Sequence, residues 1–136
     1  MIGSIWCKRF VVCVLLLGAA VGPGLAQSSG FPFDGELILD VPPMPGSKRI
    51  PNMDIGADGK LAVELWCSRT EGQVVVAGDT ITVLLGPLAE RSCAPERARA
   101  DMEFVEALNA VTNWRREGDF VRLIGPKTLR FRVPTN

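Results

Sequence analysis

The sequence has 136 residues, with 15 lysines and arginines against 15 aspartates and glutamates, and it contains neither histidine nor tyrosine. The lack of histidine excludes Ser-His-Asp and Cys-His catalytic arrangements, histidine metal sites and the commonest general base near neutral pH. The carboxylates are scattered among predicted turns and exposed faces, so we predict that the protein is not an enzyme and has no catalytic, metal-binding or cofactor-binding residue.

Residues 1–26 have the organisation of a secretory signal peptide. Lys8 and Arg9 precede an apolar run over residues 11–21, and small residues then lead to a cleavage site after Ala26. The alternative is a transmembrane anchor, but this run is about half of the roughly 20 residues needed to cross a bilayer. We therefore expect an exported protein, periplasmic or secreted, whose mature form has no transmembrane segment.

The mature chain is predicted to hold a flexible segment, residues 27–35, and one domain, residues 36–134. Loss of the leader leaves 13 basic residues against 15 acidic ones, and a net charge near −2 argues against nucleic-acid binding. Residues 36–41 are a plausible first strand. Two prolines end it, and prolines continue through the loop that follows, as far as residue 51.

Two hairpins follow, and their turn sequences fix which residues lie opposite each other. A three-residue loop ending at Gly59 and a two-residue loop at Gly78-Asp79 each place apolar residues on one shared face. The expected pairs are Ile55 with Leu61, Met53 with Val63, Val76 with Ile81, and Val74 with Val83.

Cys67 and Cys93 are the two cysteines that remain after the leader is removed, and in an exported domain we expect them to form a disulfide. Closing a loop of this length stabilises a fold by roughly 3.5 kcal/mol in the chain-entropy model. The alternatives are metal ligation and a reactive dithiol. Metal ligation would need further soft or imidazole ligands, and a reactive pair usually has a Cys-x-x-Cys spacing.

Residues 96–111 form the one convincing helix. Pro95 suits its first turn, and acidic residues cluster early, where the helix dipole favours them. An apolar stripe at helical spacing predicts that the helix packs on the sheet. The stripe consists of Met102, Val105, Leu108 and Val111, with Phe104 beside it.

The last two hairpins predict a row of arginines. A loop at Gly118-Asp119 places Arg115 opposite Arg122, and a loop over residues 125–127 places Arg122 opposite Arg130. Like charges directly opposite are unfavourable in a sheet. Either carboxylates such as Glu117 and solvent neutralise the row, or the row is a docking face for an anionic partner, since the arginine fork suits phosphate and carboxylate.

Two tryptophans have different predicted places. Trp114 shares the apolar face of its hairpin and is expected in the core. Trp66 falls on the opposite face from Cys67, together with Glu64, so it either packs against the helix or is exposed as a contact residue.

The second half of the chain resembles META domains, the HslJ-like family of exported bacterial envelope proteins. The similarity covers roughly residues 60–133 and follows the order strand, cysteine, hairpin, cysteine, helix and two hairpins. The segments that carry it are Trp66-Cys67-Ser68-Arg69-Thr70-Glu71-Gly72, the hairpin over residues 74–83, Ser92-Cys93-Ala94-Pro95-Glu96, the helix with Phe104 and Leu108, and residues 117–124 and 129–131. The sequence departs from the family pattern at Trp66, where glycine is usual, and at Ser68, where asparagine is usual.

The resemblance implies a β-rich α+β fold, an antiparallel sheet of hairpins curled into a partial barrel with one packed helix. It also implies an exported protein, sometimes linked to heat or antibiotic stress, and it supplies no catalytic residue. We therefore expect a monomeric, non-catalytic periplasmic protein that contacts an unknown envelope protein or an anionic envelope component. The alternatives are a binder of a small apolar ligand inside the barrel and an inhibitor of an envelope hydrolase that uses the loops 42–51 or 86–95.

Overall fold

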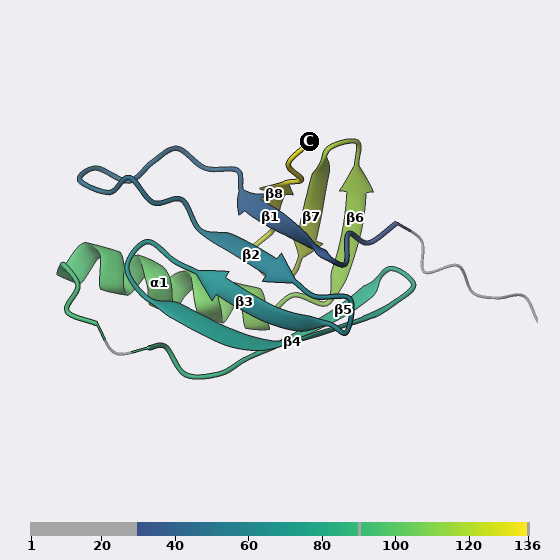
Figure 1. The fold of residues 1–136 in the computed structure, drawn as a ribbon, viewed down its shortest axis with the longest axis horizontal. Coiled ribbons are helices and arrows are strands. Elements are labelled where there is room, and N and C mark those ends of the chain that lie inside the picture. Colours follow the sequence, from purple (N-terminus) through teal and green to yellow (C-terminus); the bar gives the residue numbers. More distant parts are fainter. Residues whose placement is uncertain (1–29, 90, 136) are drawn as a thin grey trace, which may run out of the picture.

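The computed structural model describes residues 30–89 and 91–135, so the predicted signal peptide lies outside the described residues. Eight strands and one helix follow each other along the chain (Figure 1). Their bounds are β1 Gly35–Leu39, β2 Asn52–Ile55, β3 Lys60–Glu64, β4 Arg69–Ala77, β5 Thr80–Leu85, α1 Pro95–Asn109, β6 Asn113–Glu117, β7 Phe120–Ile124 and β8 Leu129–Arg132.

The strands form a closed antiparallel barrel in sequence order. The sequence predicted a partial barrel. The barrel is closed because the first and last strands of the domain pair with each other. β8 returns to β1, where Ile38 pairs with Arg132 and Leu39 with Phe131. The thinnest contact is between β5 and β6, which share the single pair Thr80 and Asn113, because α1 is inserted between these strands. Strand pairing therefore runs around the whole barrel in the described residues, with its weakest point between β5 and β6.

The predicted hairpin registers are confirmed at every pair that the turn sequences specified. Each hairpin pairs apolar residues on the inner face, as alternation and loop length require. The observed pairs are Ile55 with Leu61, Met53 with Val63, Val76 with Ile81, Val74 with Val83, Trp114 with Leu123, Arg115 with Arg122, Leu123 with Leu129, Val121 with Phe131, and Arg122 with Arg130.

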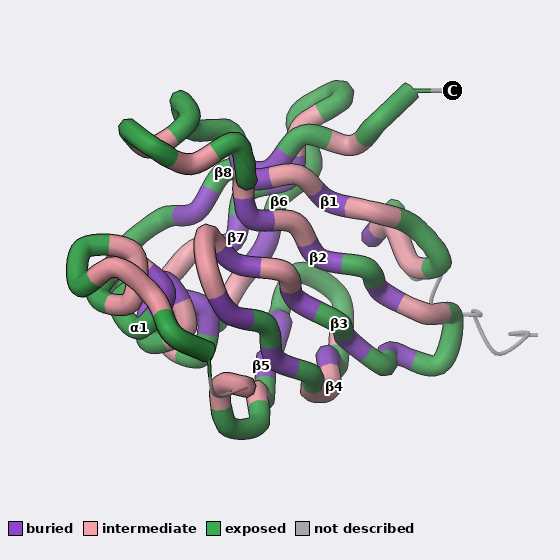
Figure 2. Tube along the Cα trace, turned by 60° about the vertical axis from the view of Figure 1, so that its left-hand side comes forward, coloured by how far each residue is buried: buried purple, intermediate pink, exposed green. Residues whose placement is uncertain are grey.

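Side chains fill the barrel interior. Along β2, β3 and β8, buried and exposed residues alternate, which marks one inward and one outward face (Figure 2). Leu65, Val83, Leu123 and Phe131 are each at most 3% exposed. An eight-stranded barrel is just wide enough for such side chains to occupy its interior, so these residues form a packed core.

The helix is confirmed, but its buried face differs from the predicted stripe. Met102 is 63% exposed, whereas its neighbour Asp101 is fully buried. Asp101, Phe104 and Leu108 are spaced three and four residues apart and therefore share the inward face of α1. The prediction at Met102 was wrong because a buried carboxylate was not foreseen on this face.

The segment predicted to be flexible contains a residue, Phe31, that is buried against the barrel. The ring of Phe31 is buried, with its edge on Trp114 at a centroid distance of 5.0 Å and on Phe33 at 4.9 Å. Trp114 is itself in the core, as predicted, and its indole N–H donates to the carbonyl of Gly78 at 2.8 Å. Phe31 therefore packs against the barrel shortly before β1.

None of the helices in residues 30–89 and 91–135 has the length and apolar character needed to cross a membrane.

Candidate functional site

A short turn between β3 and β4 carries the disulfide. The turn spans residues 65–68 and is closed by a hydrogen bond from the N–H of Leu65 to the carbonyl of Ser68, 2.9 Å long. Cys67 in this turn is bonded to Cys93, just before α1, with 6.0 Å between their Cα atoms. The predicted disulfide is therefore present in the structure, and it ties the turn to the start of the helix.

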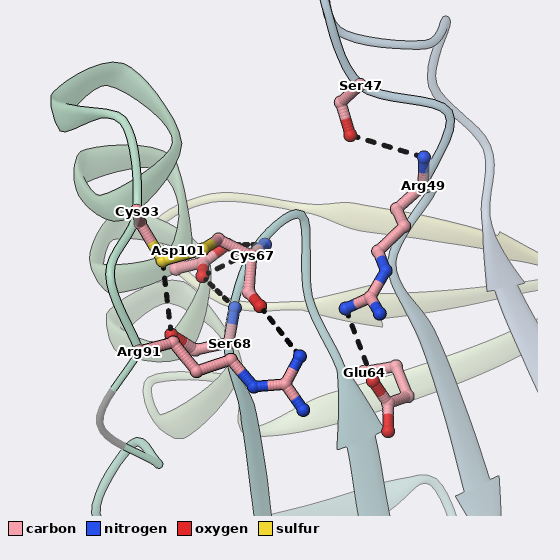
Figure 3. Close-up of polar contacts among 8 residues, drawn as sticks. All are labelled: Ser47, Arg49, Glu64, Cys67, Ser68, Arg91, Cys93 and Asp101. Carbon is pink, nitrogen blue, oxygen red and sulfur yellow. Dashed lines mark hydrogen bonds and ion pairs between the residues drawn. A yellow bond between two sulfur atoms is a disulfide. The ribbon is translucent and has the colours of Figure 1, made fainter.

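Asp101 of α1 reaches the same turn, as Figure 3 shows. One of its carboxylate oxygens accepts a hydrogen bond from the N–H of Ser68 at 2.7 Å, and its oxygens also accept weaker bonds of 3.3 and 3.4 Å from the N–H of Cys67. A buried carboxylate requires such partners, because an unpaired buried charge is strongly unfavourable. Asp101 was missed in the sequence analysis. The signal that could have revealed it is a charged residue at helical spacing from the apolar Phe104 and Leu108.

Cys67, Cys93 and Asp101 bring three potential metal-ligand atoms within 4.8 Å of one another. Metals and electrophiles require the thiolate form of cysteine, and sulfurs bonded in a disulfide are not thiolates. The oxygens of Asp101 are already engaged by backbone N–H groups. We conclude that this cluster holds the turn against the helix.

The two long loops considered in the sequence meet at the disulfide. Parts of the loop 42–51 and of the loop 86–95 line a hollow of about 350 Å³ that we call the basic pocket. In Figure 1 the loop after β1 and the N-terminal end of α1 lie at the same end of the barrel. The residues lining the pocket are Gly46, Ser47, Lys48, Arg49, Trp66, Cys67, Arg91, Ser92 and Arg97.

Among the described residues, the lining of the basic pocket includes four cationic residues, Lys48, Arg49, Arg91 and Arg97, and no carboxylate. Arg49 makes a long ion pair of 3.8 Å with Glu64, which lies outside the lining. Arg91 donates to the carbonyl of Cys67 over 3.5 Å, at the limit of a hydrogen bond. Figure 3 shows the side chains of Arg49 and Arg91 with these contacts. Positive charges gathered in a hollow raise the local concentration of anions.

Trp66 forms part of the wall of this pocket. The indole is partly buried and lies edge-on against Phe104 of α1, with ring centroids 5.9 Å apart. Its Nε1–H is buried and has no hydrogen-bond partner among the described residues. Trp66 therefore packs against the helix, one of its two predicted places, and its single polar atom is left without an acceptor.

A second hollow, of about 240 Å³, has Trp66 as part of its wall as well; we call it the helix-side pocket. It lies between α1 and the strand ends of β1 and β8. Its apolar lining includes Leu39, Phe104 and Leu129, and its charged lining consists of Asp40, Glu103, Lys127 and Arg130.

The predicted arginine row exists, but two of its three members have carboxylate partners. Arg122 pairs with Glu117 at 2.8 Å. Arg130 pairs with Asp40 at 2.6 Å and stacks on the ring of Phe120, 3.6 Å from its centroid. Among the described residues, Arg115 makes no ion pair. The repulsion expected between opposite arginines is thus offset within the protein, most of all at Arg122 and Arg130.

The fold and this site describe a small closed β-barrel of the α+β class, whose disulfide joins a turn to its one described helix. The chain belongs to the META domain family, whose model matches residues 33–133. This match extends the resemblance seen in the sequence to the N-terminal strands. The disulfide and the basic pocket both lie within the matched residues.

Two solved structures share the fold. A protein from Burkholderia xenovorans, determined by NMR, superimposes with a TM-score of 0.62 at 14% identity, covering 76% of this chain and 84% of its own. A second NMR structure gives a TM-score of 0.59 at 16% identity, covering 74% of this chain and 89% of its own. At these identities the likeness shows the fold alone. A comparison with curated proteins found no significant match.

Proposed function

We propose that this META-domain protein is a non-catalytic, exported envelope protein that acts by binding an anionic partner at its surface. The observation that carries the proposal is the basic pocket, which gathers Lys48, Arg49, Arg91 and Arg97 in a chain of zero formal net charge. Charge concentrated in this way serves recognition and steering of an oppositely charged partner.

The polar groups nearest the pocket support a binding role more than a catalytic one. Asp101 is bonded to the backbone of the turn, and both cysteines beside it are oxidised. The chain also offers no histidine to act as a general base. The described residues that line the basic pocket therefore include groups that hold an anion, and neither histidine nor a carboxylate is among them.

The disulfide and the predicted signal peptide support an oxidising compartment outside the cytoplasm, and we propose the periplasm. Family resemblance makes heat or antibiotic stress the setting in which a phenotype is expected. We propose that the protein acts as a monomer, since its described strands pair with one another around a closed barrel.

The other two functions have weaker support. A small apolar ligand inside the barrel would need a cavity where Leu65, Val83, Leu123 and Phe131 are packed. An inhibitor that inserts a loop into an enzyme cleft needs a protruding surface. The loops 42–51 and 86–95 instead contribute to a hollow, which is suited to receive a partner.

The test is affinity capture from periplasmic extract with three forms of the protein: the unchanged chain, Arg91→Glu/Arg97→Glu, and Arg115→Glu/Arg122→Glu on the arginine row. We expect a partner to be retained by the unchanged chain and by the arginine-row variant, and lost by the basic-pocket variant. If none of the forms captures a partner under stressed or unstressed growth, the proposed function is wrong.

A further inference from the structure

Trp66 lies where two hollows of different character meet. On one side is the basic pocket, with Lys48, Arg91 and Arg97, and on the other is the helix-side pocket, with Leu39 and Phe104. Trp66 belongs to the lining of both. The two hollows therefore adjoin at Trp66 and together offer a cationic surface next to an apolar one.

We propose that the two hollows form one docking groove for an acidic peptide segment of a partner protein, with an aliphatic anchor residue beside its carboxylates. This inference rests on the proposed function and deepens it, because it names the chemistry of the anionic partner. Carboxylates bind over the basic pocket, and the anchor enters the helix-side pocket past Trp66.

The size of the helix-side pocket favours a single side chain over a whole small molecule. Pockets for drug-sized ligands usually measure roughly 300–1,000 Å³. The helix-side pocket, at about 240 Å³, falls below that range. Protein interfaces, by contrast, commonly place one apolar anchor in a small pocket and surround it with polar contacts.

The charges around the groove give the bound segment a direction. In the helix-side pocket Lys127 and Arg130 balance the charges of the two carboxylates in its lining. The described residues that line the basic pocket include four cations and no carboxylate. A carboxylate on the ligand is therefore attracted more strongly to the basic pocket than to the helix-side pocket, whose charges balance. In an extended peptide, residues i and i+2 share a face about 7 Å apart, so a Glu-x-Leu spacing presents both groups to the groove.

The indole of Trp66 supplies a further requirement for a ligand. Its Nε1–H is a buried donor without an acceptor among the described residues, and such a donor is unfavourable. In the proposed complex, a backbone carbonyl of the peptide accepts a hydrogen bond from this N–H. Trp114 is the matched control, because its indole N–H already donates to Gly78.

A membrane surface fits this end of the barrel less well than a peptide. Proteins that dock on bilayers combine basic residues with protruding apolar side chains. The residues that the two loops contribute to the basic pocket are instead glycine, serine and cations: Gly46, Ser47, Lys48, Arg49, Arg91 and Ser92. Arginine forks bind the carboxylates of such a peptide in pairs of parallel hydrogen bonds.

The experiment uses the purified protein with its disulfide intact, labelled with ¹⁵N, and an N-acetylated peptide that contains two glutamates and a leucine in the pattern Glu-Glu-x-Leu. We expect the indole N–H signal of Trp66 to shift on titration, and that of Trp114 to remain in place. A peptide with serine in place of leucine, and one with glutamine in place of glutamate, should each bind at least about tenfold more weakly.

Variants locate the binding surface. Arg91→Glu/Arg97→Glu should weaken binding at least about tenfold, whereas Arg115→Glu/Arg122→Glu, which carries the same change of charge on the arginine row, should bind nearly as the unchanged protein does. Trp66→Phe keeps the aromatic packing on Phe104 and removes the N–H, so it should bind several-fold more weakly.

Three outcomes overturn the inference. The first is the absence of peptide binding by the folded protein, and the second is an equal loss in both charge-reversal variants. The third is binding to vesicles containing phosphatidylglycerol that exceeds binding to the peptide. None of these outcomes changes which partner affinity capture retains. The proposed function is therefore tested by the affinity-capture experiment alone.

Discussion

Asp101 on α1 accepts a hydrogen bond of 2.7 Å from the backbone N–H of Ser68, in a turn 33 residues earlier in the chain. Both residues are buried, and the neighbouring Cys67 is covalently linked to Cys93 just before the same helix. The helix is therefore fastened to the barrel twice at one place, once by a carboxylate and once by a disulfide.

Replacing Asp101 with asparagine should destabilise the protein by about 2 kcal/mol. The change removes the charge from the hydrogen bonds, and it brings a donor NH₂ group toward backbone donors. Urea unfolding with the disulfide intact measures the loss. Glu106→Gln, on the exposed side of the same helix, is the matched control and should change stability by less than about 0.5 kcal/mol. Equal stability of both variants would mean that the buried carboxylate does not hold the turn.

The double variant Cys67→Ala/Cys93→Ala should lose roughly 3.5 kcal/mol of stability, through the entropy of the opened loop. In this background we expect Asp101→Asn to change the free energy of unfolding by a different amount than in the unchanged protein, because the disulfide and the carboxylate hold the same turn. Groups that share a turn usually couple by about 0.5–3 kcal/mol. A double-mutant cycle from urea unfolding measures the coupling, and strict additivity would show that the two act independently.

The sequence predicts the hairpins of this fold because their information is local. A loop ending at Gly59 or centred on Gly118-Asp119 fixes the register within a few residues, and alternation of apolar residues confirms which face is inward. Closure of the barrel joins β1 to β8, which lie about 90 residues apart, as the pairing of Leu39 with Phe131 shows. No local pattern specifies that pairing, so the barrel was predicted only as partial.

The candidate site was harder to predict for a related reason. Arg49 and Arg91 lie far apart in the sequence and come to line one hollow only after the two loops converge at the disulfide. The arginine row was easier to find, since hairpin register places its members side by side. Register does not show which carboxylates lie nearby, and Asp40 reaches Arg130 from across the closed seam of the barrel.

Gly72→Ala should destabilise the barrel by at least about 3 kcal/mol. Gly72 lies in β4, and a Cβ there would collide with the backbone carbonyl of Leu84 in the neighbouring strand. Because backbone cannot move aside as a flexible side chain can, the pairing of β4 with β5 must shift. Thermal unfolding followed by circular dichroism gives the measurement.

Gly118→Ala is the control for this prediction. Gly118 has a positive φ of 61°, but open space surrounds its Cβ position. The substitution should therefore have only the conformational cost of about 1–2 kcal/mol that an L-residue incurs in the left-handed region. A Gly72→Ala protein as stable as the Gly118→Ala protein would contradict the close approach of the two strands.

Phe31→Ala should reduce stability by about 2–3 kcal/mol and should change the fluorescence of Trp114. The ring of Phe31 is 7% exposed and covers the face of the core next to Trp114. Its removal leaves a gap and exposes the indole to water. Phe33→Ala serves for comparison and should have a smaller effect, because Phe33 is only partly buried. Unchanged emission in the Phe31→Ala protein would show that residues 30–34 do not cover the barrel in solution.

Arg130→Gln should lower stability by about 0.5–1 kcal/mol at low salt. Arg130 joins β8 to the residue after β1 through Asp40, and its guanidinium also stacks on Phe120. Exposed ion pairs contribute little, and stacking on an aromatic ring adds a comparable amount.

Arg115→Gln is the matched control on the same row and should leave stability unchanged, since Arg115 makes no ion pair with any described residue. Raising the salt concentration should narrow the difference between the two variants, because screening weakens the pair with Asp40 more than the stacking. A difference that persists in full at 1 M salt would assign the contribution of Arg130 to Phe120 alone.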